Sequence, residues 1–212
     1  ETYSSRKLAL DKRIEKSLNR LNRKKVRVLY FHDIGESMEE TLIWANKQKE
    51  KGIIEKVGIS IYGIDDIEEN WLEYIDAIQI PMSIYDRRAE IEITEKKLKE
   101  KGVMIVARSV FMQGLILADL NNWPDYIDEE LRELHRRTKA RDEKNKLSMI
   151  DVALGFIQSQ KIADEIIVGI TSQQDLREIT STYQRRKKLD AFDLIEDLRL
   201  TASAVDPRYW KK

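Results

Sequence analysis

The sequence contains no cysteine, which excludes a disulfide framework, a thiolate nucleophile, a zinc ribbon and an iron–sulfur cluster. Only His32 and His135 could offer imidazole to a metal ion, so we predict no metal site. Three prolines and eight glycines among 212 residues are too few for collagen-like or low-complexity disorder. Because 42% of the residues are hydrophobic, we expect the chain to fold.

Neither sign of charge is in excess, since 38 Lys and Arg residues balance 38 Asp and Glu residues. No overall field then attracts a polyanion, and we expect neither nucleic acid nor a membrane surface as a partner. No apolar run approaches the roughly 20 residues that span a bilayer, and residues 1–12 are too polar for a secretory signal. A cytoplasmic setting is the expectation.

Five short apolar runs rich in Val or Ile alternate with polar segments. The runs are Val26–Phe31, Ile54–Ile59, Ala77–Pro81, Val103–Ala107 and Glu165–Gly169. Nearly continuous apolar runs of this length predict parallel strands that are covered on both faces. The long connection between the last two runs contains two stretches of helical character.

Helical spacing precedes the first run and follows the second, at Leu10, Ile14, Leu18 and Leu21 and at Ile64, Ile67 and Trp71. Ser37 stands three residues before Glu40, the spacing of a capping box, which predicts a helix that begins there. Gly52 and Gly102 can each adopt the left-handed conformation that closes a helix before a strand. The residues around these two glycines repeat at an interval of 50 residues, which indicates repeated strand–helix units.

Such units pack with right-handed crossovers, either in an open doubly wound sheet or in a closed eight-stranded barrel. No Gly-x-Gly-x-x-Gly follows any run, so we favour the barrel, whose chemistry lies at the carboxyl ends of its strands. The last run leads to Ser172 and Asp175. A helix that begins there could bind phosphate, and the same spacing also fits a plain capping box.

Seven segments carry a family resemblance by their order and spacing. They are Ser17–Leu21, Val28–His32, Lys56–Ser60, Ile78–Ile80, Ala107–Leu115, Val152–Leu154 and Ile167–Gly169. The series resembles the aldo-keto reductases, and it is most similar to the branch found beside surface-polysaccharide and sugar-nucleotide genes. The resemblance implies a (β/α)8 barrel of the TIM type and the reduction of an aldehyde or ketone, with sugar-like carbonyls as the suggested substrates, by NADPH or NADH.

In that family a tyrosine donates a proton to the carbonyl oxygen, assisted by lysine, aspartate and histidine. Only the histidine has a match here, at His32, where the imidazole could orient the substrate carbonyl. A lone histidine after a strand would otherwise be interpreted as structural. His135 lies in a charged helical stretch, and we expect it to be a solvated surface residue.

The cofactor contacts implied by the resemblance lie in the second half of the chain. Matching positions for the nicotinamide end, the pyrophosphate and the adenosine end are Ser60, Gln79, Arg108, Ser109, Val110, Gln113, Gly114, Gly169, Thr171, Ser172, Asp175 and Glu178. Asp175 stands where relatives that prefer NADP often have an arginine, and an anion there would repel a 2′-phosphate. The choice between NAD and NADP stays open.

The five runs resemble the fourth to eighth strands of the barrel, so we expect residues 1–212 to form a single partial barrel domain that lacks the first three strand units. The catalytic tyrosine, lysine and aspartate belong to those units, and we expect the 212-residue chain to be inactive. The alternative is a noncatalytic nucleotide-binding or assembly module. Five strands cannot close a barrel, and the open edges predict self-association.

Overall fold

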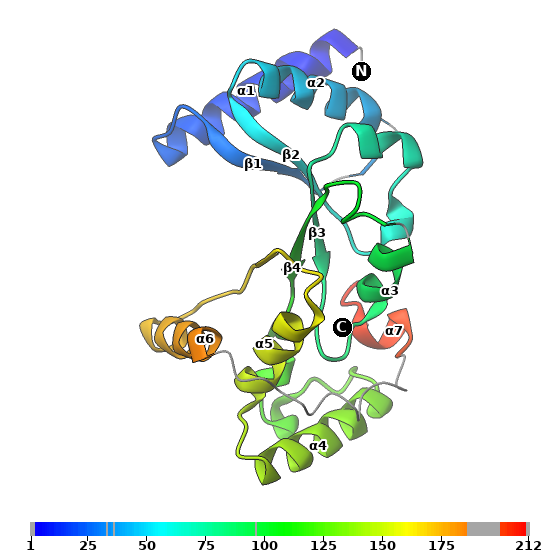
Figure 1. The fold of residues 1–212 in the computed structure, drawn as a ribbon, viewed down its shortest axis with the longest axis vertical. Coiled ribbons are helices and arrows are strands. Elements are labelled where there is room, and N and C mark those ends of the chain that lie inside the picture. The colour runs from blue at the N-terminus through cyan, green and yellow to red at the C-terminus, as the bar shows by residue number, and fades with distance from the viewer. Residues whose placement is uncertain (1–2, 33, 36, 96, 186–199, 211–212) are drawn as a thin grey trace. The chain divides into compact units, whose positions relative to one another are not determined.

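The computed structural model describes residues 3–32, 34–35, 37–95, 97–185 and 200–210. The helices are α1 (Tyr3–Leu21), α2 (Met38–Glu50), α3 (Arg88–Glu95), α4 (Glu129–Lys144), α5 (Met149–Gln160), α6 (Gln173–Arg185) and α7 (Ala202–Val205), and four 3₁₀ segments are η1 (Ile64–Asp66), η2 (Glu69–Glu73), η3 (Met112–Leu117) and η4 (Leu120–Asn122). The strands are β1 (Val26–Phe31), β2 (Ile54–Ser60), β3 (Ala77–Pro81), β4 (Met104–Arg108) and β5 (Glu165–Ile166). Figure 1 shows these elements along the chain.

The chain divides into two compact units. Unit 1 comprises Glu1–Gln79 and Leu98–Met104, and unit 2 comprises Ile80–Lys97 and Ile105–Lys212. Strands β3 and β4 each contribute residues to both units.

Hydrogen-bonded strands follow one another in chain order, β1-β2-β3-β4-β5. The β1–β2, β2–β3 and β4–β5 pairings are parallel. Strands in simple chain order are the arrangement of successive barrel units, whereas the open doubly wound sheet contains a reversal of order. The topology therefore agrees with the barrel type predicted from the sequence.

Two aspartates that directly precede strands accept hydrogen bonds from the neighbouring strands. The Asp76 carboxylate accepts one from the Val57 N–H, in the middle of β2, at 2.9 Å, and the Asp164 carboxylate accepts one from the Ile105 N–H, near the start of β4, at 2.8 Å. Lys49 Nζ donates to both oxygens of Asp76, at 2.6 and 2.7 Å. Side chains thus satisfy backbone donors of β2 and β4 beside the points where β3 and β5 begin.

In unit 1, α1 packs against α2, and α2 packs on β2 (Figure 1). Val57 and Ile59 of β2 are fully buried, as are Leu42 and Ala45 of α2. The buried Trp44 indole N–H donates to Asp11 of α1 at 2.8 Å, which satisfies its polar atom. Burial of this apolar surface, at about 25 cal/mol per Å², stabilises the unit.

In unit 2, α5 packs against α4, α6 and η3. Ile105, Val106 and Ala107 of β4 are fully buried, and most of α5 is buried as well, at Asp151, Val152, Ala153, Leu154, Gly155, Phe156 and Ile157. Ser148 and Asp151 form a capping box at the start of α5, with the Ser148 hydroxyl accepting from the Asp151 N–H at 3.1 Å. The two predicted helices of the long connection are confirmed as α4 and α5.

Several predicted boundaries are wrong. The helix expected over residues 64–71 is two short 3₁₀ segments, η1 and η2. The last strand has only Glu165 and Ile166. The Ile167 N–H makes one more bond, to the Ala107 carbonyl, and the chain then leaves the sheet. The fourth strand begins at Met104 instead of Val103.

The predicted capping box at Ser37 is also wrong. Helix α2 begins beside it, at Met38, but the Ser37 side chain makes no capping bond. Its backbone, at φ −107° and ψ 20°, departs from the extended conformation from which a serine hydroxyl reaches the first turn. Gly52 and Gly102 do have positive φ, 72° and 79°, as the repeat predicted.

His135 is not a surface residue, contrary to the sequence expectation. Its side chain is 1% exposed, and Nδ1 lies 2.9 Å from the Tyr85 hydroxyl. The imidazole also contacts the Trp123 ring, with 4.8 Å between ring centroids. His135 lies on the buried face of α4 with Leu131, Leu134, Thr138 and Asp142, although most of its neighbours in the sequence are charged. Burial lowers the pKa of His135 to about 4, and the nearby Lys139 acts in the same direction.

We expect His135 to make the stability of the protein sensitive to acid. The folded-state pKa, about 4, lies below the ordinary value of 6.5, so the unfolded chain binds the proton more tightly, and stability falls as pH drops through about 6.5. Unfolding by urea should show a loss of about 2 kcal/mol between about pH 7 and about pH 5 that His135→Gln lacks. His32→Gln, which removes an exposed imidazole, is the control. Identical pH dependence in the wild type and His135→Gln would contradict the assignment.

Candidate functional site

Unit 2 contains a cavity of about 480 Å³ at the carboxyl ends of β4 and β5. Its walls come from the end of β4 and the loop that follows it, from the segment between β5 and α6, from one position on α5 and from two positions on α6. The lining residues are Arg108, Ser109, Val110, Phe111, Gln113, Gly114, Leu117, Ile150, Ile167, Val168, Gly169, Thr171, Asp175 and Ile179.

The loop after β4 has an unusual backbone. Ser109, Met112 and Gln113 have φ of 56°, 46° and 58°, values that residues with a Cβ seldom adopt, and Gly114 follows at 89°. Two tight turns hold this course, in which the Met112 N–H donates to the Ser109 carbonyl at 2.8 Å and the Gly114 N–H to the Phe111 carbonyl at 2.9 Å. Strained backbone of this kind is concentrated at functional sites.

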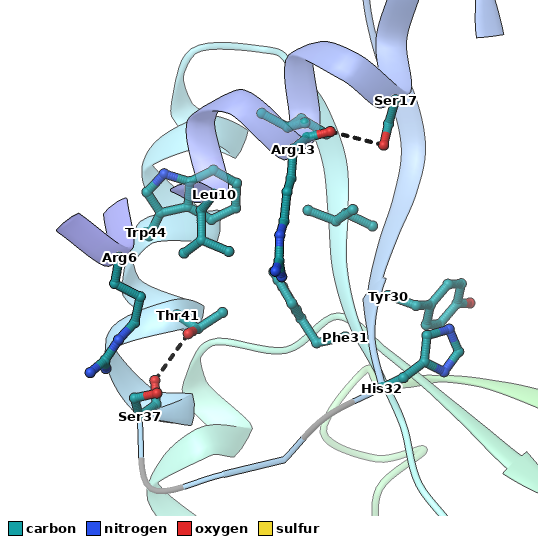
Figure 2. Close-up of a pocket in the computed structure, with 12 residues that line it drawn as sticks. Arg6, Leu10, Arg13, Ser17, Tyr30, Phe31, His32, Ser37, Thr41 and Trp44 are labelled. Atoms are coloured by element: carbon teal, nitrogen blue, oxygen red, sulfur yellow. Dashed lines mark hydrogen bonds between the residues drawn. The ribbon is translucent and has the colours of Figure 1, made fainter. Parts of the chain in front are cut away.

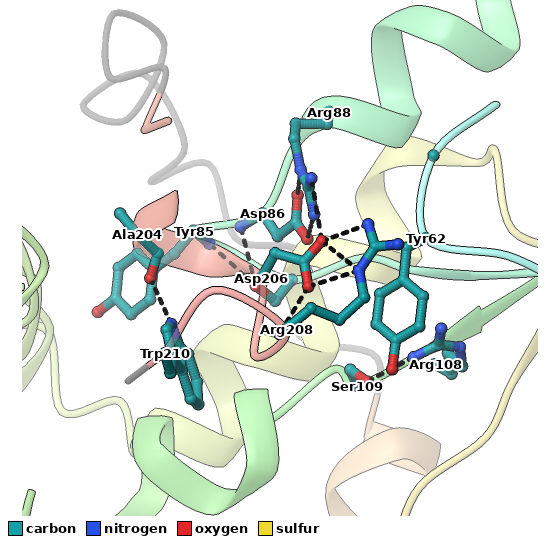
Figure 3. Close-up of polar contacts among 12 residues, drawn as sticks. Tyr62, Tyr85, Asp86, Arg88, Arg108, Ser109, Ala204, Asp206, Arg208 and Trp210 are labelled. Atoms are coloured by element: carbon teal, nitrogen blue, oxygen red, sulfur yellow. Dashed lines mark hydrogen bonds and ion pairs between the residues drawn. The ribbon is translucent and has the colours of Figure 1, made fainter. Parts of the chain in front are cut away.

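The Arg108 side chain begins this loop. Its Nη1 donates to the Ser109 hydroxyl at 3.3 Å, and Figure 3 shows the two side chains next to each other. The Arg108 carbonyl accepts from the Met82 N–H at 3.0 Å, so the end of β4 is also tied to the segment after β3. A cationic group and a hydroxyl are thereby fixed at one end of the cavity.

The opposite wall is the beginning of α6. One oxygen of Asp175 accepts hydrogen bonds from the Thr171 hydroxyl at 2.6 Å, the Thr171 N–H at 3.1 Å and the Ser172 N–H at 3.0 Å. The Ser172 hydroxyl accepts from the Asp175 N–H at 3.0 Å. These bonds, with that from the Thr171 hydroxyl the strongest, lower the pKa of Asp175 to about 2. The predicted capping box is therefore present, and its Asp175 is one of the residues that line the cavity.

A row of alternating charges holds the segment between β3 and α3. Arg88 donates to Asp86 at 2.8 Å and lies 3.6 Å from Asp206, and Arg208 pairs with the same Asp206 at 2.7 Å (Figure 3). Asp206 is fully buried. Burial alone would raise the pKa of Asp206, but the hydrogen bonds from Arg208 outweigh it and the pKa is lowered. Asp206, from the described C-terminal residues, thus helps to hold the segment between β3 and α3 through its contact with Arg88.

Three predicted site residues lie in unit 1, on or next to successive strands. Ser60 is the last residue of β2 and Gln79 the middle residue of β3. The Ser60 hydroxyl donates to Gln79 Oε1 at 3.1 Å, as expected for two residues that are partners in the strand register. His32 comes directly after Phe31, which pairs with Ile59. His32 is exposed and lines a second cavity of about 510 Å³, which Figure 2 shows.

The unit 2 cavity brings together eight of the twelve residues that the resemblance implied for cofactor binding. They are Arg108, Ser109, Val110, Gln113, Gly114, Gly169, Thr171 and Asp175. Ser172 and Glu178 lie at the start and in the middle of α6 without lining the cavity. The sequence analysis missed six wall residues, all of them apolar, because nothing in the sequence distinguishes them from core positions. They are Phe111, Leu117, Ile150, Ile167, Val168 and Ile179.

The described residues lack two other kinds of site. They contain no group of three or more His, Asp or Glu side chains placed to hold a metal ion. None of their helices combines the length and the apolar character that a bilayer crossing requires.

Comparison with known proteins agrees with the geometry. The profile of the Aldo/keto reductase family matches residues 2–199. The chain therefore belongs to the aldo/keto reductase family. No curated protein sequence is significantly similar to it.

Solved structures share the fold at low sequence identity. The apo form of the aldo-keto reductase AKR11C1 from Bacillus halodurans is 21% identical, with a TM-score of 0.69 over 93% of this chain and 66% of that one. Its holo form gives a TM-score of 0.70, with 21% identity and coverage of 93% and 65%. The glycerol dehydrogenase AKR11B4 from Gluconobacter oxydans gives 0.61, with 15% identity and coverage of 86% and 65%. The chain thus spans under two thirds of the length of these structures.

The loop conformation can be tested at Gly114. A Cβ at this position would meet no heavy atom within 4 Å, so Gly114→Ala isolates the cost of φ 89°. We expect a loss of about 1 kcal/mol in the free energy of unfolding by denaturant. Gly63, at φ −147° with the same open surroundings, is the matched control, and Gly63→Ala should be neutral or slightly stabilising. Equal effects of the two substitutions would contradict a strained loop.

Proposed function

We propose that the chain is an NAD(P)H-dependent oxidoreductase that acts on an aldehyde or ketone, with sugar-like carbonyls as the substrate class. The observation that carries the proposal is the unit 2 cavity, because it gathers eight residues matched independently to cofactor-binding positions of the family. The described strands would correspond to the fourth to eighth of the barrel within a single partial domain. The proposed setting is the cytoplasm.

The donors around the cavity suit a dinucleotide. The Ser109 hydroxyl and the Arg108 guanidinium, both on residues that line the cavity, would supply a donor and a positive charge for a pyrophosphate. Gly169, Thr171 and the apolar Ile179 form a wall that could accommodate the adenosine end. Ser60 and Gln79 offer a hydroxyl and an amide for the nicotinamide carboxamide.

When bound, the cofactor would supply the hydride. His32, exposed at the carboxyl end of β1, would orient the substrate carbonyl by a hydrogen bond. His32 is the one catalytic position of the family that this chain matches, and a missing general acid costs about 10²- to 10⁴-fold in rate. The alternative is a noncatalytic nucleotide-binding or assembly module. Two observations favour it: eight of the implied cofactor-binding residues share one cavity, whereas only one catalytic position of the family has a match.

We expect the 212-residue chain to bind a nicotinamide cofactor and to reduce carbonyl compounds only near background. Quenching of protein fluorescence during titration with NADH and NADPH measures binding, and loss of nicotinamide absorbance with reactive aldehydes measures turnover. Ser109→Ala and Gln113→Ala should weaken binding. Absence of saturable binding would refute the cofactor assignment, whereas turnover at the rate of a complete family member would refute the inactivity.

Cofactor preference depends on Asp175 in this proposal. Replacing the carboxylate by a guanidinium removes repulsion of a 2′-phosphate and adds a charge-assisted bond, so Asp175→Arg should raise affinity for NADP relative to NAD at least about fivefold. Asp125→Arg makes the same change of charge at an exposed position outside the cavity and is the control. An unchanged ratio of affinities in Asp175→Arg would remove Asp175 from the cofactor site.

A further inference from the structure

The loop after β4, residues 109–117, is held from outside by a tryptophan. The Trp123 indole N–H donates to the Leu115 carbonyl at 2.9 Å. Leu115 belongs to η3 and lies between Gly114 and Leu117, which both line the unit 2 cavity. Trp123 is 4% exposed, so water does not compete for this bond. Trp123 therefore contacts the cavity loop without itself lining the cavity.

Trp123 is in turn fixed by helix α4. The Arg132 guanidinium of α4 donates to the Trp123 carbonyl at 3.2 Å, and its Cζ lies 5.9 Å from the centre of the indole ring. The same guanidinium donates to three further carbonyls, those of Leu120, Pro124 and Ile127. Because the Arg132 side chain is largely buried, these bonds take the place of its hydration. One arginine thus holds the segment between η4 and α4 that presents Trp123.

His135 supports the same indole ring from about one turn further along α4. Its imidazole lies against the indole, with 4.8 Å between ring centroids, and its Nδ1 is 2.9 Å from the Tyr85 hydroxyl. Tyr85 is also buried and belongs to the segment between β3 and α3. A continuous set of contacts therefore runs from the cavity loop through Trp123 to α4 and to the segment after β3.

This support bears on binding because the loop backbone is strained. Ser109, Met112 and Gln113 have positive φ, and such a backbone persists only where surrounding contacts over-determine it. The tight turns inside the loop join near neighbours, whereas the Trp123 bond joins the loop to a separate segment that α4 holds. A loop that already has its binding conformation has no ordering cost to meet when a ligand enters.

We propose that Trp123 is a positioning residue for the proposed cofactor site. Without touching the cofactor, Trp123 holds the loop after β4 in the conformation that lines the cavity, and it thereby raises cofactor affinity. Trp123 acts through the Leu115 carbonyl, and Arg132 and His135 hold Trp123 in place. The inference rests on the proposed function, because an effect on affinity requires that the cavity bind a nicotinamide cofactor.

The first test removes the indole N–H. Trp123→Phe keeps an aromatic ring beside His135, and we expect it to raise the dissociation constant for NADH about 5- to 10-fold, as for loss of one buried hydrogen bond. Isothermal titration calorimetry measures this binding without depending on tryptophan fluorescence. Trp44→Phe is the matched control, because Trp44 is also buried and its indole N–H donates to Asp11 in unit 1 at 2.8 Å. The control should change affinity less than about twofold.

A second pair of variants tests the support that α4 gives to Trp123. Arg132→Lys keeps the positive charge, but an ammonium group has three donors and cannot reach four carbonyls at once. It should weaken NADH binding at least about threefold. Arg136→Lys, at an exposed arginine of the same helix that pairs with Glu133, is the control and should bind as the wild type does. Equal affinities of these two variants would contradict the part of α4 in holding Trp123.

Amide hydrogen exchange tests the loop itself and needs no cofactor. In Trp123→Phe the amides of residues 110–118 should exchange at least about fivefold faster than in the wild type, with those of α5 unchanged, whereas Trp44→Phe should leave both unchanged. A general loss of stability would speed exchange in α5 as well. Unchanged exchange in the loop, or an affinity loss no larger than that of Trp44→Phe, would overturn the inference. A wild type that binds neither NADH nor NADPH would refute the proposed function instead, and the exchange rates would still decide whether Trp123 holds the loop.

Discussion

The parallel pairing of β4 with β5 is the constraint on which the candidate site depends. About sixty residues separate Ala107 from Ile166 in sequence, yet the two are partners in the ladder, and the Ile167 N–H completes it by donating to the Ala107 carbonyl at 2.8 Å. Parallel strands place their carboxyl ends at the same edge of a sheet. The loop after β4 and the start of α6 consequently face one cavity, and neither segment alone forms it.

Buried polar groups outside the cavity lining also stabilise the interior of unit 2. Asp206 is fully buried but accepts from Arg208 and lies near Arg88, so its charge is compensated. His135 and Tyr85 lie within hydrogen-bond distance of each other, at 2.9 Å, inside the unit. Loss of one partner from such a pair leaves a buried group unsatisfied, at a cost of about 1–3 kcal/mol. These contacts restrict how the chain can run around β3 and β4.

Asp175 has a structural role and also lies at the proposed cofactor site. Its carboxylate satisfies donors at the beginning of α6, which is a structural task, and the same residue lines the cavity. A helix start whose donors are already engaged by an internal anion presents less positive potential to an external one. The charge of the cavity is therefore set by Arg108 and Asp175 together.

Much of this arrangement was predictable from the sequence. Nearly continuous apolar runs located all five strands. In β2, β3 and β4 the reason is burial, because a strand covered on both faces must be apolar at nearly every position. The expectation of cover on both faces is wrong for β1 and β5, which are only half-buried. Gly52 and Gly102 have the predicted positive φ, because this backbone requirement is local. The segments that resemble the aldo-keto reductases located most of the cavity, because residues next to buried strands keep their spacing whatever the connecting helices contain.

Other features were decided by tertiary structure. His135 stands among charged residues in the sequence, and its burial follows only from the packing of α4 against Tyr85 and Trp123. Ser37 has the sequence signature of a cap without the backbone conformation that a cap requires. The sequence by itself determined which segments become strands, because burial selects residue types locally. Tertiary structure decided which side chains share a cavity, because that depends on contacts between segments that are far apart along the chain.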